Sequence, residues 1–423
     1  MYADVLIMGT PSNYDQILTY QIPAEIKLRE GSLVSVPVKN RISQGLVLAV
    51  HNNKPNLNSL KEIRQVLSSE PVITDSGLKL AYWLADYYVC SLNKVFPLFL
   101  PPAVRTKKQI VYVLNSSSVE EMLLQEKERK ILEVLRANQS SGLTLQEIER
   151  KVRQSVKNEL EYLLENKFIR QETVFVPQVK SKKEVFFKIK AGAVGAEDLL
   201  KRAPLQRKIY ELLQKSSCSE KDLKEKGLYS RSALQGLYEK KIIEIYYEEI
   251  SRNPLLEKLS SERPQVLTPA QEHASEVICN HLQTDKRKWL LFGITGSGKT
   301  EVYLRVMQKI INQGKQVLYL VPEISLTPQI VSLLAEVFGK EEVAILHSAL
   351  SLGERYDQLR KIREGKARVV LGPRSAVFAP FTDLGLIIID EEHENTYKQN
   401  EPDPRYDAHR VAEKLVEYAE QLC

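Results

Sequence analysis

Residues 293–300, with the sequence GITGSGKT, constrain the fold of this chain more than any other segment. They match the pattern G-x-x-x-x-G-K-[ST] at every fixed position, between the apolar run WLLF and the amphipathic run TEVYLRVMQKI. This pattern predicts a strand, a tight loop and a helix whose first N–H groups can bind a phosphate. A glycine-rich turn that matches by chance is the alternative, and the predicted strand and helix argue against it.

The residue types of this loop suit a nucleotide site. Gly293, Gly296 and Gly298 allow tight backbone turns, so that several N–H groups can face one phosphate. Lys299 is placed to reach the terminal phosphates, and the Thr300 hydroxyl to bind Mg²⁺. We predict that the following loop residues bind the nucleotide: Gly293, Thr295, Gly296, Ser297, Gly298, Lys299 and Thr300.

From about residue 267 onward, short apolar runs alternate with helical stretches. After WLLF these runs are KQVLYLVPE, VAILHS, ARVVLG and LGLIIIDEE. Continuous apolar strands separated by helices are typical of a parallel sheet that is covered on both faces. The sequence therefore predicts an α/β fold for this part of the chain.

The run LGLIIID ends at Asp390, which the parallel sheet would place at its carboxyl edge, where such sheets bind ligands. We predict that Asp390 holds Mg²⁺ through water, and that Glu391 orients and deprotonates the attacking water. A solvated acidic strand end is the alternative, and the upstream Lys299 argues against it. The residues themselves suggest no role for Glu392, and spacing alone would make His393 a surface imidazole.

The part of the chain before residue 267 has a different texture. Residues 1–105 are mainly β-rich, with the runs GSLVSVPV and QGLVLAVHNN, then helical spacing from Leu78 to Tyr87. An internal repeat follows at residues 128–175 and 206–250, each copy predicting helix, short helix, turn, helix and a β-rich tail. This is the winged-helix order.

In both copies of the repeat, the third helix is predicted to start with Ser and to end in Lys. Lys157 and Arg231 lie early in these third helices, where a winged helix contacts DNA. Several acidic residues lie there too, so a structural or protein-docking role is the alternative. The basic segment between the copies is predicted to be a strand and a linker.

The bulk properties set further bounds. The four cysteines lie far apart, which supports neither a zinc site nor a disulfide framework. No apolar run approaches the roughly 20 residues of a membrane span, and the N-terminus lacks the basic start of a signal peptide. We therefore expect a cytoplasmic protein. The net charge of +6 is compatible with a nucleic-acid partner, although a mixed surface gives the same sum.

An Asp-Glu-x-His motif after a phosphate loop resembles helicase superfamily 2. The form DEEH at 390–393, followed by YKQ at 397–399 and PRY at 404–406, resembles the primosomal replication-restart helicases, the PriA (primosomal protein N-prime) family. Five further segments are similar to parts of the same family. In the order given below, they resemble its entry to the helicase core, two of its DNA-contacting motifs, the end of its N-terminal domain, and the junction between its accessory modules and the motor. They are LTPAQEHA (267–274), LVPEISLTPQ (320–329), GPRSAVFAP (372–380), LADYYVCSLNKVFPLFLPPAVR (84–105) and SRNPL (251–255).

The resemblance implies a multidomain chain with α/β, β and α parts. It assigns residues 1–105 to a β-rich, 3′-end-binding-like DNA-binding domain and 106–180 to a winged-helix domain. Residues 181–255 are then a linker and a second winged-helix-like module. Residues 256–423 are a RecA-like parallel α/β helicase lobe that ends before the later motifs.

The resemblance also implies an ATP-dependent 3′-to-5′ DNA helicase that uses Mg²⁺, recognises stalled or abandoned replication forks and initiates primosome assembly. The implied partners are forked and single-stranded DNA, primosome proteins and single-stranded-DNA-binding protein, with no membrane. By the same resemblance Gln271 contacts adenine and His393 couples hydrolysis to single-stranded DNA. The implied DNA-binding residues are Arg374, Tyr397, Lys398, Gln399, Arg405 and Tyr406.

The physical chemistry of these residues is compatible with DNA sensing. Tyrosine rings stack on bases with about 1–3 kcal/mol each and without sequence preference. Arginine and lysine side chains bind phosphates. Core packing is the alternative role for Tyr397 and Tyr406.

The sequence departs from the family pattern at several positions. Where the family has Arg-Tyr-His-Ala-Arg-Asp, this chain has RYDAHR, with Asp407, His409 and Arg410 at three family positions. Thr19 replaces an aspartate that shapes the family's pocket for a 3′ DNA end, so that pocket is in doubt here. Lys39 stands where the family tends to have glycine.

The family continues beyond the acidic motif with a second RecA-like lobe and a cysteine-rich zinc module, so we expect a fragment or truncated product here, and zinc only in the missing part. Such a fragment is expected to bind nucleotide and DNA with little DNA-stimulated hydrolysis. One alternative is a fork-DNA-binding scaffold without motor activity. Another is a different superfamily 2 translocase, such as a restriction subunit.

Overall fold

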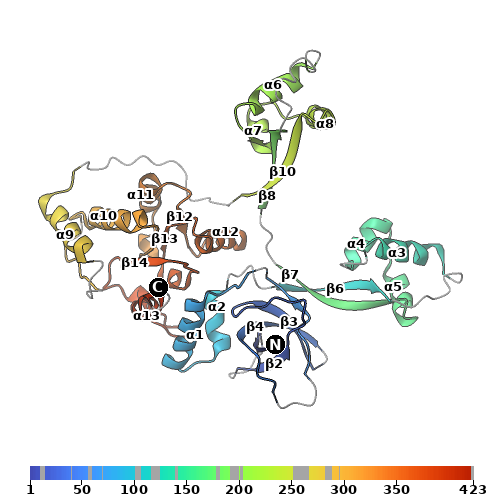
Figure 1. The fold of residues 1–423 in the computed structure, drawn as a ribbon, viewed down its shortest axis with the longest axis horizontal. Coiled ribbons are helices and arrows are strands. Elements are labelled where there is room, and N and C mark those ends of the chain that lie inside the picture. The colour runs from blue at the N-terminus through green and yellow to red at the C-terminus, as the bar shows by residue number, and fades with distance from the viewer. Residues whose placement is uncertain are drawn as a thin grey trace. The chain divides into compact units, whose positions relative to one another are not determined.

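The computed structural model describes residues 1–9, 15–39, 41–55, 60–68, 70–100, 106–115, 124–138, 142–177, 182–190, 200, 203–250, 266–281, 288–294 and 296–420 (Figure 1). The chain forms two compact units. One consists of Met1–Val179 together with Leu256–Cys423, and the other is Lys180–Leu255. Among the described helices, none has the length and apolar character that crossing a bilayer requires.

The first unit begins with a β-rich domain, as predicted. Its strands are β1 (Tyr2–Ile7), β2 (Ile17–Gln21), β3 (Leu33–Val38), β4 (Arg41–His51) and β5 (Gln65–Val66). They form one sheet in the order β2-β1-β4-β3-β5, and every pairing is antiparallel. Alternation along β1 buries Ala3, Val5 and Ile7 in one core and Leu6 in another, because successive side chains point to opposite faces.

Two helices follow this sheet, α1 (Asp75–Tyr87) and α2 (Leu92–Phe99). The helical spacing in the sequence predicted α1. The Thr74 hydroxyl accepts from the Gly77 N–H at 3.2 Å and caps α1. The Asp15 carboxylate caps α2, since it accepts from the N–H groups of Leu92 (2.7 Å) and Asn93 (2.9 Å).

The region around the first repeat copy, residues 106–177, contains three helices and two long strands. They are β6 (Thr106–Leu114), α3 (Glu126–Arg136), α4 (Leu145–Val152), α5 (Lys157–Glu165) and β7 (Ile169–Pro177). β6 and β7 pair antiparallel along their length. The order of helices and final strand is the predicted one, and the winged-helix assignment stays a prediction. The expected serine cap is wrong for α5, because Val156 is the N-cap and Ser155 instead donates to Glu149.

The second unit contains the other repeat copy. Its elements are β8 (Lys182–Ile189), α6 (Pro204–Leu213), β9 (Cys218–Ser219), α7 (Glu220–Glu225), α8 (Arg231–Glu239) and β10 (Ile243–Ile250). The sheet order is β10-β8-β9, with antiparallel pairs. Here the predicted serine cap is correct, since Ser230 accepts from the Ala233 N–H. The SRNPL segment lies outside the described residues.

The last part of the first unit is a parallel α/β lobe, as predicted. Its strands are β11 (Gln316–Leu320), β12 (Val343–Ile345), β13 (Val369–Gly372) and β14 (Leu384–Ile389), in the order β12-β13-β11-β14. All three pairings are parallel. The helices are α9 (Pro269–His281), α10 (Lys299–Asn312), α11 (Pro328–Phe338), α12 (Leu352–Arg363) and α13 (Ala408–Glu420), with short 3₁₀ helices η4 (Glu323–Ser325), η5 (Arg374–Phe378) and η6 (Asn395–Tyr397).

Both faces of this sheet are buried. Val317 and Tyr319 of β11 join a core with α10 and α11, whereas Leu318 and Leu320 join a core on the opposite face. That second core also contains buried residues of α1, α2, α12 and α13. The lobe and the N-terminal domain therefore share a hydrophobic core through α1 and α2.

The predicted strand WLLF is wrong. Residues 289–292 adopt no strand, and Leu290, Phe292 and Ile294 are 78%, 92% and 80% exposed. The physical reason is the lack of a ladder partner. β14 is an edge strand whose described pairing is with β11, and no described strand pairs with residues 289–292.

Candidate nucleotide and nucleic-acid site

Two glycines of the loop at 293–300 adopt a backbone conformation that suits a tight phosphate-binding turn. Gly296 and Gly298 have φ angles of +78° and +80°, which side chains with a Cβ rarely adopt. Lys299 begins α10, and its Nζ donates to the carbonyl oxygens of Gly293 (2.9 Å) and Ile294 (3.3 Å). A bound phosphate would compete with these two carbonyls for the ammonium. Thr295 lies outside the described residues, and Thr300 lies in the first turn of α10.

Gln271 of α9 touches this loop directly. Its Nε2 donates to the Ser297 carbonyl at 3.2 Å, and its Oε1 accepts from the Thr268 N–H at 2.9 Å. A Cβ on Gly298 would clash with the Gln271 amide, and a Cβ on Gly293 would lie 2.8 Å from Ser297 Oγ. The loop is therefore closely packed against Gln271, whose role toward adenine stays a prediction.

Asp390 lies directly after β14, at the carboxyl edge of the parallel sheet. Its Oδ1 accepts from the Glu391 N–H at 3.1 Å and from Tyr303 Oη at 3.4 Å. Its Oδ2 accepts from Tyr319 Oη at 3.0 Å. Tyr303 is on α10, so the phosphate-loop helix and the acidic motif meet at this carboxylate.

The next acidic residues turn away from the strand. Glu391 has a φ of +46°, in the left-handed region that costs a non-glycine residue roughly 1–2 kcal/mol. Its carboxylate lies 3.8 Å from His393 Nδ1, and the His393 side chain is 73% exposed. The structure therefore places Glu391 and His393 together at the surface beside Asp390, where DNA or nucleotide can reach them.

Three of the six predicted DNA-binding side chains are buried. Tyr397 is 1% exposed, and its Oη donates to the carbonyls of Asp390 (2.6 Å) and Leu320 (3.2 Å). Tyr406 is 1% exposed and packs edge-on against Phe378. Gln399 is 8% exposed, and its Nε2 donates to two backbone carbonyls of its own loop. Neither tyrosine ring is exposed enough to stack on a base, so both fit the core-packing alternative.

The other three are basic and shape or border the same loop. Arg374 Nη1 donates to the carbonyls of Thr396 (3.1 Å) and Lys398 (3.0 Å). The Lys398 side chain is exposed, and that of Arg405 is 62% exposed beside Asp403. Lys398 and Arg405 are therefore the side chains of this set that DNA phosphates can reach.

The loop after the acidic motif, residues 394–407, also contacts the N-terminal domain. Tyr88 Oη accepts from the Asp407 N–H at 3.0 Å, and Lys398 Nζ lies 5.6 Å from the Tyr88 ring centre. Lys94 of α2 pairs with Asp403 at 3.1 Å. These contacts hold the loop between α1, α2 and the sheet.

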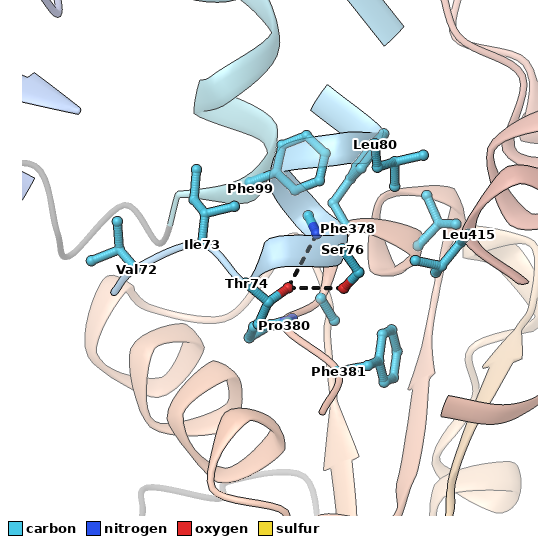
Figure 2. A pocket seen from close by; sticks show the side chains of 13 residues that line it. Val72, Ile73, Thr74, Ser76, Leu80, Phe99, Phe378, Pro380, Phe381 and Leu415 are labelled. Carbon is cyan, nitrogen blue, oxygen red and sulfur yellow. Dashed lines mark hydrogen bonds between the residues drawn. The ribbon is translucent and has the colours of Figure 1, made fainter. Parts of the chain in front are cut away.

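A small apolar cavity of about 20 Å³ marks the seam between α1 and the lobe (Figure 2). Phe99 and Leu80 line one side, and Phe378, Phe381 and Leu415 the other. The polar groups at this seam are already paired, since Thr74 Oγ1 lies 3.1 Å from Ser76 Oγ and accepts from the Gly77 N–H. Thr74 and Ser76 are the polar side chains that line the cavity and they pair with each other, so the cavity is a packing seam.

The structure shows the contacts or the backbone conformation at three positions where the sequence departs from the family pattern. Thr19 Oγ1 donates to Asp4 Oδ1 at 2.7 Å, so a carboxylate from β1 lies directly beside Thr19. Asp407 Oδ1 accepts from the His409 N–H at 2.9 Å and lies 3.0 Å from His409 Nδ1. Lys39 has a φ of +51°, in the left-handed region that favours glycine.

Sequence reasoning missed four residues of this region: Asp4, Tyr88, Tyr303 and Tyr319. Tyr303 carried a local signal, because it follows Lys299 by four residues and so lies on the same face of α10. Asp4, Tyr88 and Tyr319 reach their partners across strand registers or between domains, and nothing in the sequence marks them.

Comparison with known families agrees with this geometry. Residues 5–101 match the family model of a 3'DNA-binding domain (3'BD), and residues 268–419 match that of a DEAD/DEAH box helicase. A Bacillus subtilis protein named replication restart protein PriA is 35% identical over 429 residues, covering 99% of this chain and 52% of the relative. The chain belongs to the PriA family.

Other relatives with the same name agree. The Synechocystis protein is 30% identical over 430 residues, covering 97% of this chain and 50% of the relative. The Treponema pallidum protein is 48% identical over 129 residues, or 30% of this chain and 19% of the relative. The chain thus spans about half of the Bacillus subtilis and Synechocystis relatives, each of which matches nearly all of this chain.

A DEAD/DEAH box helicase domain uses ATP with a divalent cation, and the residues present suit both. The loop contributes glycines with positive φ, the Lys299 ammonium and the Thr300 hydroxyl. Asp390 contributes a carboxylate, and oxygen donors are the ligands that Mg²⁺ prefers. Which individual residues bind the nucleotide stays a prediction.

Proposed function

We propose that this chain carries the ATP-binding lobe and the DNA-binding domain of a replication-restart helicase. In the intact protein this activity is ATP-dependent 3′-to-5′ unwinding of DNA at stalled or abandoned replication forks, followed by primosome assembly. One observation supports the proposal most directly. The phosphate-loop helix α10 and the acidic motif meet where Tyr303 Oη contacts Asp390 Oδ1 at 3.4 Å.

The residues of this site divide the work of hydrolysis. The loop N–H groups and the Lys299 ammonium hold the phosphates and offset their charge. Thr300 and Asp390 would hold the cation, which would neutralise phosphate charge. Glu391 orients the attacking water and accepts its proton. Gln271, which already contacts Ser297, completes the site on the base side.

His393 and the loop 394–407 link this site to DNA. His393 lies beside Glu391, and Tyr397 holds the Asp390 carbonyl, so a shift of the loop reaches both acidic residues. We propose that Lys398 and Arg405 hold DNA phosphates, with Arg374, Tyr397, Gln399 and Tyr406 shaping the loop. In the intact protein, His393→Ala should keep ATP binding and lose the stimulation of hydrolysis by single-stranded DNA. Equal stimulation in variant and parent would contradict this role.

The N-terminal domain is proposed to bind the 3′ end of DNA. The family's pocket uses an aspartate that Thr19 replaces, and the Asp4–Thr19 pair keeps a carboxylate and a hydroxyl at this place. Residues 106–180 and 181–255 are proposed as winged-helix modules that contact forked DNA. Contacts with primosome proteins and with single-stranded-DNA-binding protein are proposed for the intact protein.

The Lys299→Ala variant tests the proposal. It should lose most binding of a fluorescent ATP analogue, because the ammonium that holds the terminal phosphates is gone, and keep binding to forked DNA. Lys366→Ala is the matched control, since Lys366 is an exposed lysine of the same lobe paired only with Glu364 among the contacts described. Unchanged nucleotide affinity in Lys299→Ala would refute the assignment of the loop.

The conformation of residues 289–292 and the contacts of Lys299 favour a second function. Residues 289–292 form no strand, and the Lys299 ammonium is held by loop carbonyls. The 423-residue chain is therefore also a candidate for a fork-DNA-binding scaffold that binds nucleotide with little turnover. Strong DNA-stimulated hydrolysis by this chain would exclude the scaffold function.

A further inference from the structure

Tyrosine hydroxyls from three separate elements converge on Asp390. Tyr303 extends from α10, Tyr319 from β11 and Tyr397 from η6. Tyr303 and Tyr319 donate to the two carboxylate oxygens, at 3.4 and 3.0 Å, and Tyr397 donates to the backbone carbonyl at 2.6 Å. The acidic residue at the end of β14 is thus held by its side chain and by its main chain.

We propose that Tyr303 and Tyr319 are positioning residues that fix the Asp390 carboxylate for water-mediated binding of the nucleotide's divalent cation. This inference rests on the proposed nucleotide site. It adds two residues that belong to neither the phosphate loop nor the acidic motif.

The position of Tyr303 on α10 carries the first step. It follows Lys299 by four residues and Thr300 by three, so all three lie on one side of the helix. The Tyr303–Asp390 contact therefore sets the distance between the Thr300 hydroxyl and the acidic carboxylate. This link matters because residues 289–292, just before the loop, form no strand with β14.

The burial of Tyr319 carries the second step. It is 1% exposed within the core of β11, α10 and α11, so its hydroxyl requires a partner, and Asp390 Oδ2 accepts from it. Tyr319 pairs in register with Ile388, two residues before Asp390. Both phenols therefore act as hydrogen-bond donors to the carboxylate.

The number of hydrogen bonds that the Asp390 carboxylate oxygens already accept carries the third step. Each carboxylate oxygen can accept about two hydrogen bonds. Asp390 Oδ1 already accepts from Tyr303 and from the Glu391 N–H, and Oδ2 accepts from Tyr319. Among the described residues, these contacts leave one acceptor site on Oδ2, and the hydrogen bonds reduce the charge available for direct ligation. A cation is then best held through one of its own waters, which Mg²⁺ retains readily.

Conservative variants of the 423-residue chain test this role. We would measure binding of a fluorescent ATP analogue to Tyr303→Phe, Tyr319→Phe and the double variant, in EDTA and across a Mg²⁺ titration. In EDTA the affinity should match the parent. The Mg²⁺-dependent gain in affinity should fall about threefold to tenfold, as expected for one or two missing hydrogen bonds. Tyr418→Phe, on α13 of the same lobe, is the control and should match the parent.

A double-variant cycle distinguishes positioning from general packing. If the phenols act through the carboxylate, adding Tyr303→Phe to Asp390→Asn should not lower the Mg²⁺-dependent gain further. An unchanged Mg²⁺ dependence in Tyr303→Phe overturns the inference and leaves the nucleotide site standing. Equal losses with and without Asp390→Asn also overturn it. Failure of the parent chain to bind the analogue with Mg²⁺ overturns the proposed function, and this inference with it.

Discussion

The backbone N–H of Asp407 donates to Tyr88 Oη at 3.0 Å, which joins the loop after the acidic motif to the C-cap residue of helix α1 in the N-terminal domain. Lys94 and Asp403 form a second contact between the same two parts at 3.1 Å. The lobe and the N-terminal domain also share a core in which Phe99 packs against Phe378. The domain that matches the 3'DNA-binding model and the lobe that contains the glycine-rich loop are thereby packed against each other within this unit.

Tyr88→Phe should loosen this connection without opening the core. The Asp407 N–H loses its acceptor, which costs about 1 kcal/mol, while the ring stays in place. Hydrogen exchange of residues 395–410 should become several-fold faster. Tyr87→Phe is the matched control, because Tyr87 is the adjacent tyrosine with a 55% exposed side chain. Equal exchange rates in the Tyr88→Phe variant and the parent would show that the hydrogen bond does not hold the loop.

A substitution at Gly298 should affect nucleotide binding through Gln271. An alanine at this position would be strained at φ +80°, and its Cβ would push the Gln271 amide away from Ser297. Gly298→Ala should lower the free energy of unfolding by about 1–2 kcal/mol and weaken ATP-analogue binding at least tenfold. Thermal unfolding and a binding titration measure the two effects.

Gly314→Ala provides a control for the backbone strain. Gly314 has a φ of +83°, and a Cβ there would meet nothing within 4 Å. This variant should lose similar stability and keep the parent affinity for nucleotide. Adding Gln271→Ala to Gly298→Ala should remove the steric conflict. Equal nucleotide affinities in the Gly298→Ala and Gly314→Ala variants would show that Gln271 does not matter.

The exposed basic residues and the buried tyrosines of the loop should behave differently. Lys398→Ala with Arg405→Ala should weaken single-stranded DNA binding and reduce the salt dependence, by about 0.7 in slope for each phosphate that is no longer neutralised. Tyr406→Phe should keep DNA affinity, because the ring is 1% exposed and packs on Phe378. Fluorescence anisotropy at several salt concentrations measures both. A large loss of DNA affinity in Tyr406→Phe would mean that the loop rearranges on DNA.

The sequence predicted those parts of the site that lie in contiguous residues. The loop at 293–300 and the acidic end of β14 each carry their signal locally, in glycine spacing and in an apolar run before a charge. The hydrogen bond between Tyr319 and Asp390 instead depends on the register of β11 against β14, two strands that are distant in the chain. No local pattern encodes that register, so Tyr319 could not be predicted.

Two errors have related physical causes. The apolar run WLLF has the composition of a strand, but a strand also requires a hydrogen-bonded neighbour, and composition cannot report one. Tyr397 and Tyr406 have the chemistry of base-stacking residues, and their burial arises from packing against segments distant in sequence. Exposure is a property of the tertiary structure, so the sequence alone does not decide whether these tyrosine rings stack on bases or pack in the core.

Alkaline pH should destabilise the protein through its buried tyrosines. Burial raises the pKa of Tyr406 to about 12 from its usual value of 10. Between pH 10 and 12 the unfolded chain releases this proton while the folded chain keeps it, so the free energy of unfolding falls as pH rises. Urea unfolding from about pH 8 to about pH 11.5 measures the fall. Tyr406→Phe should reduce its slope. Identical slopes for parent and Tyr406→Phe would show that this phenol does not govern alkaline unfolding.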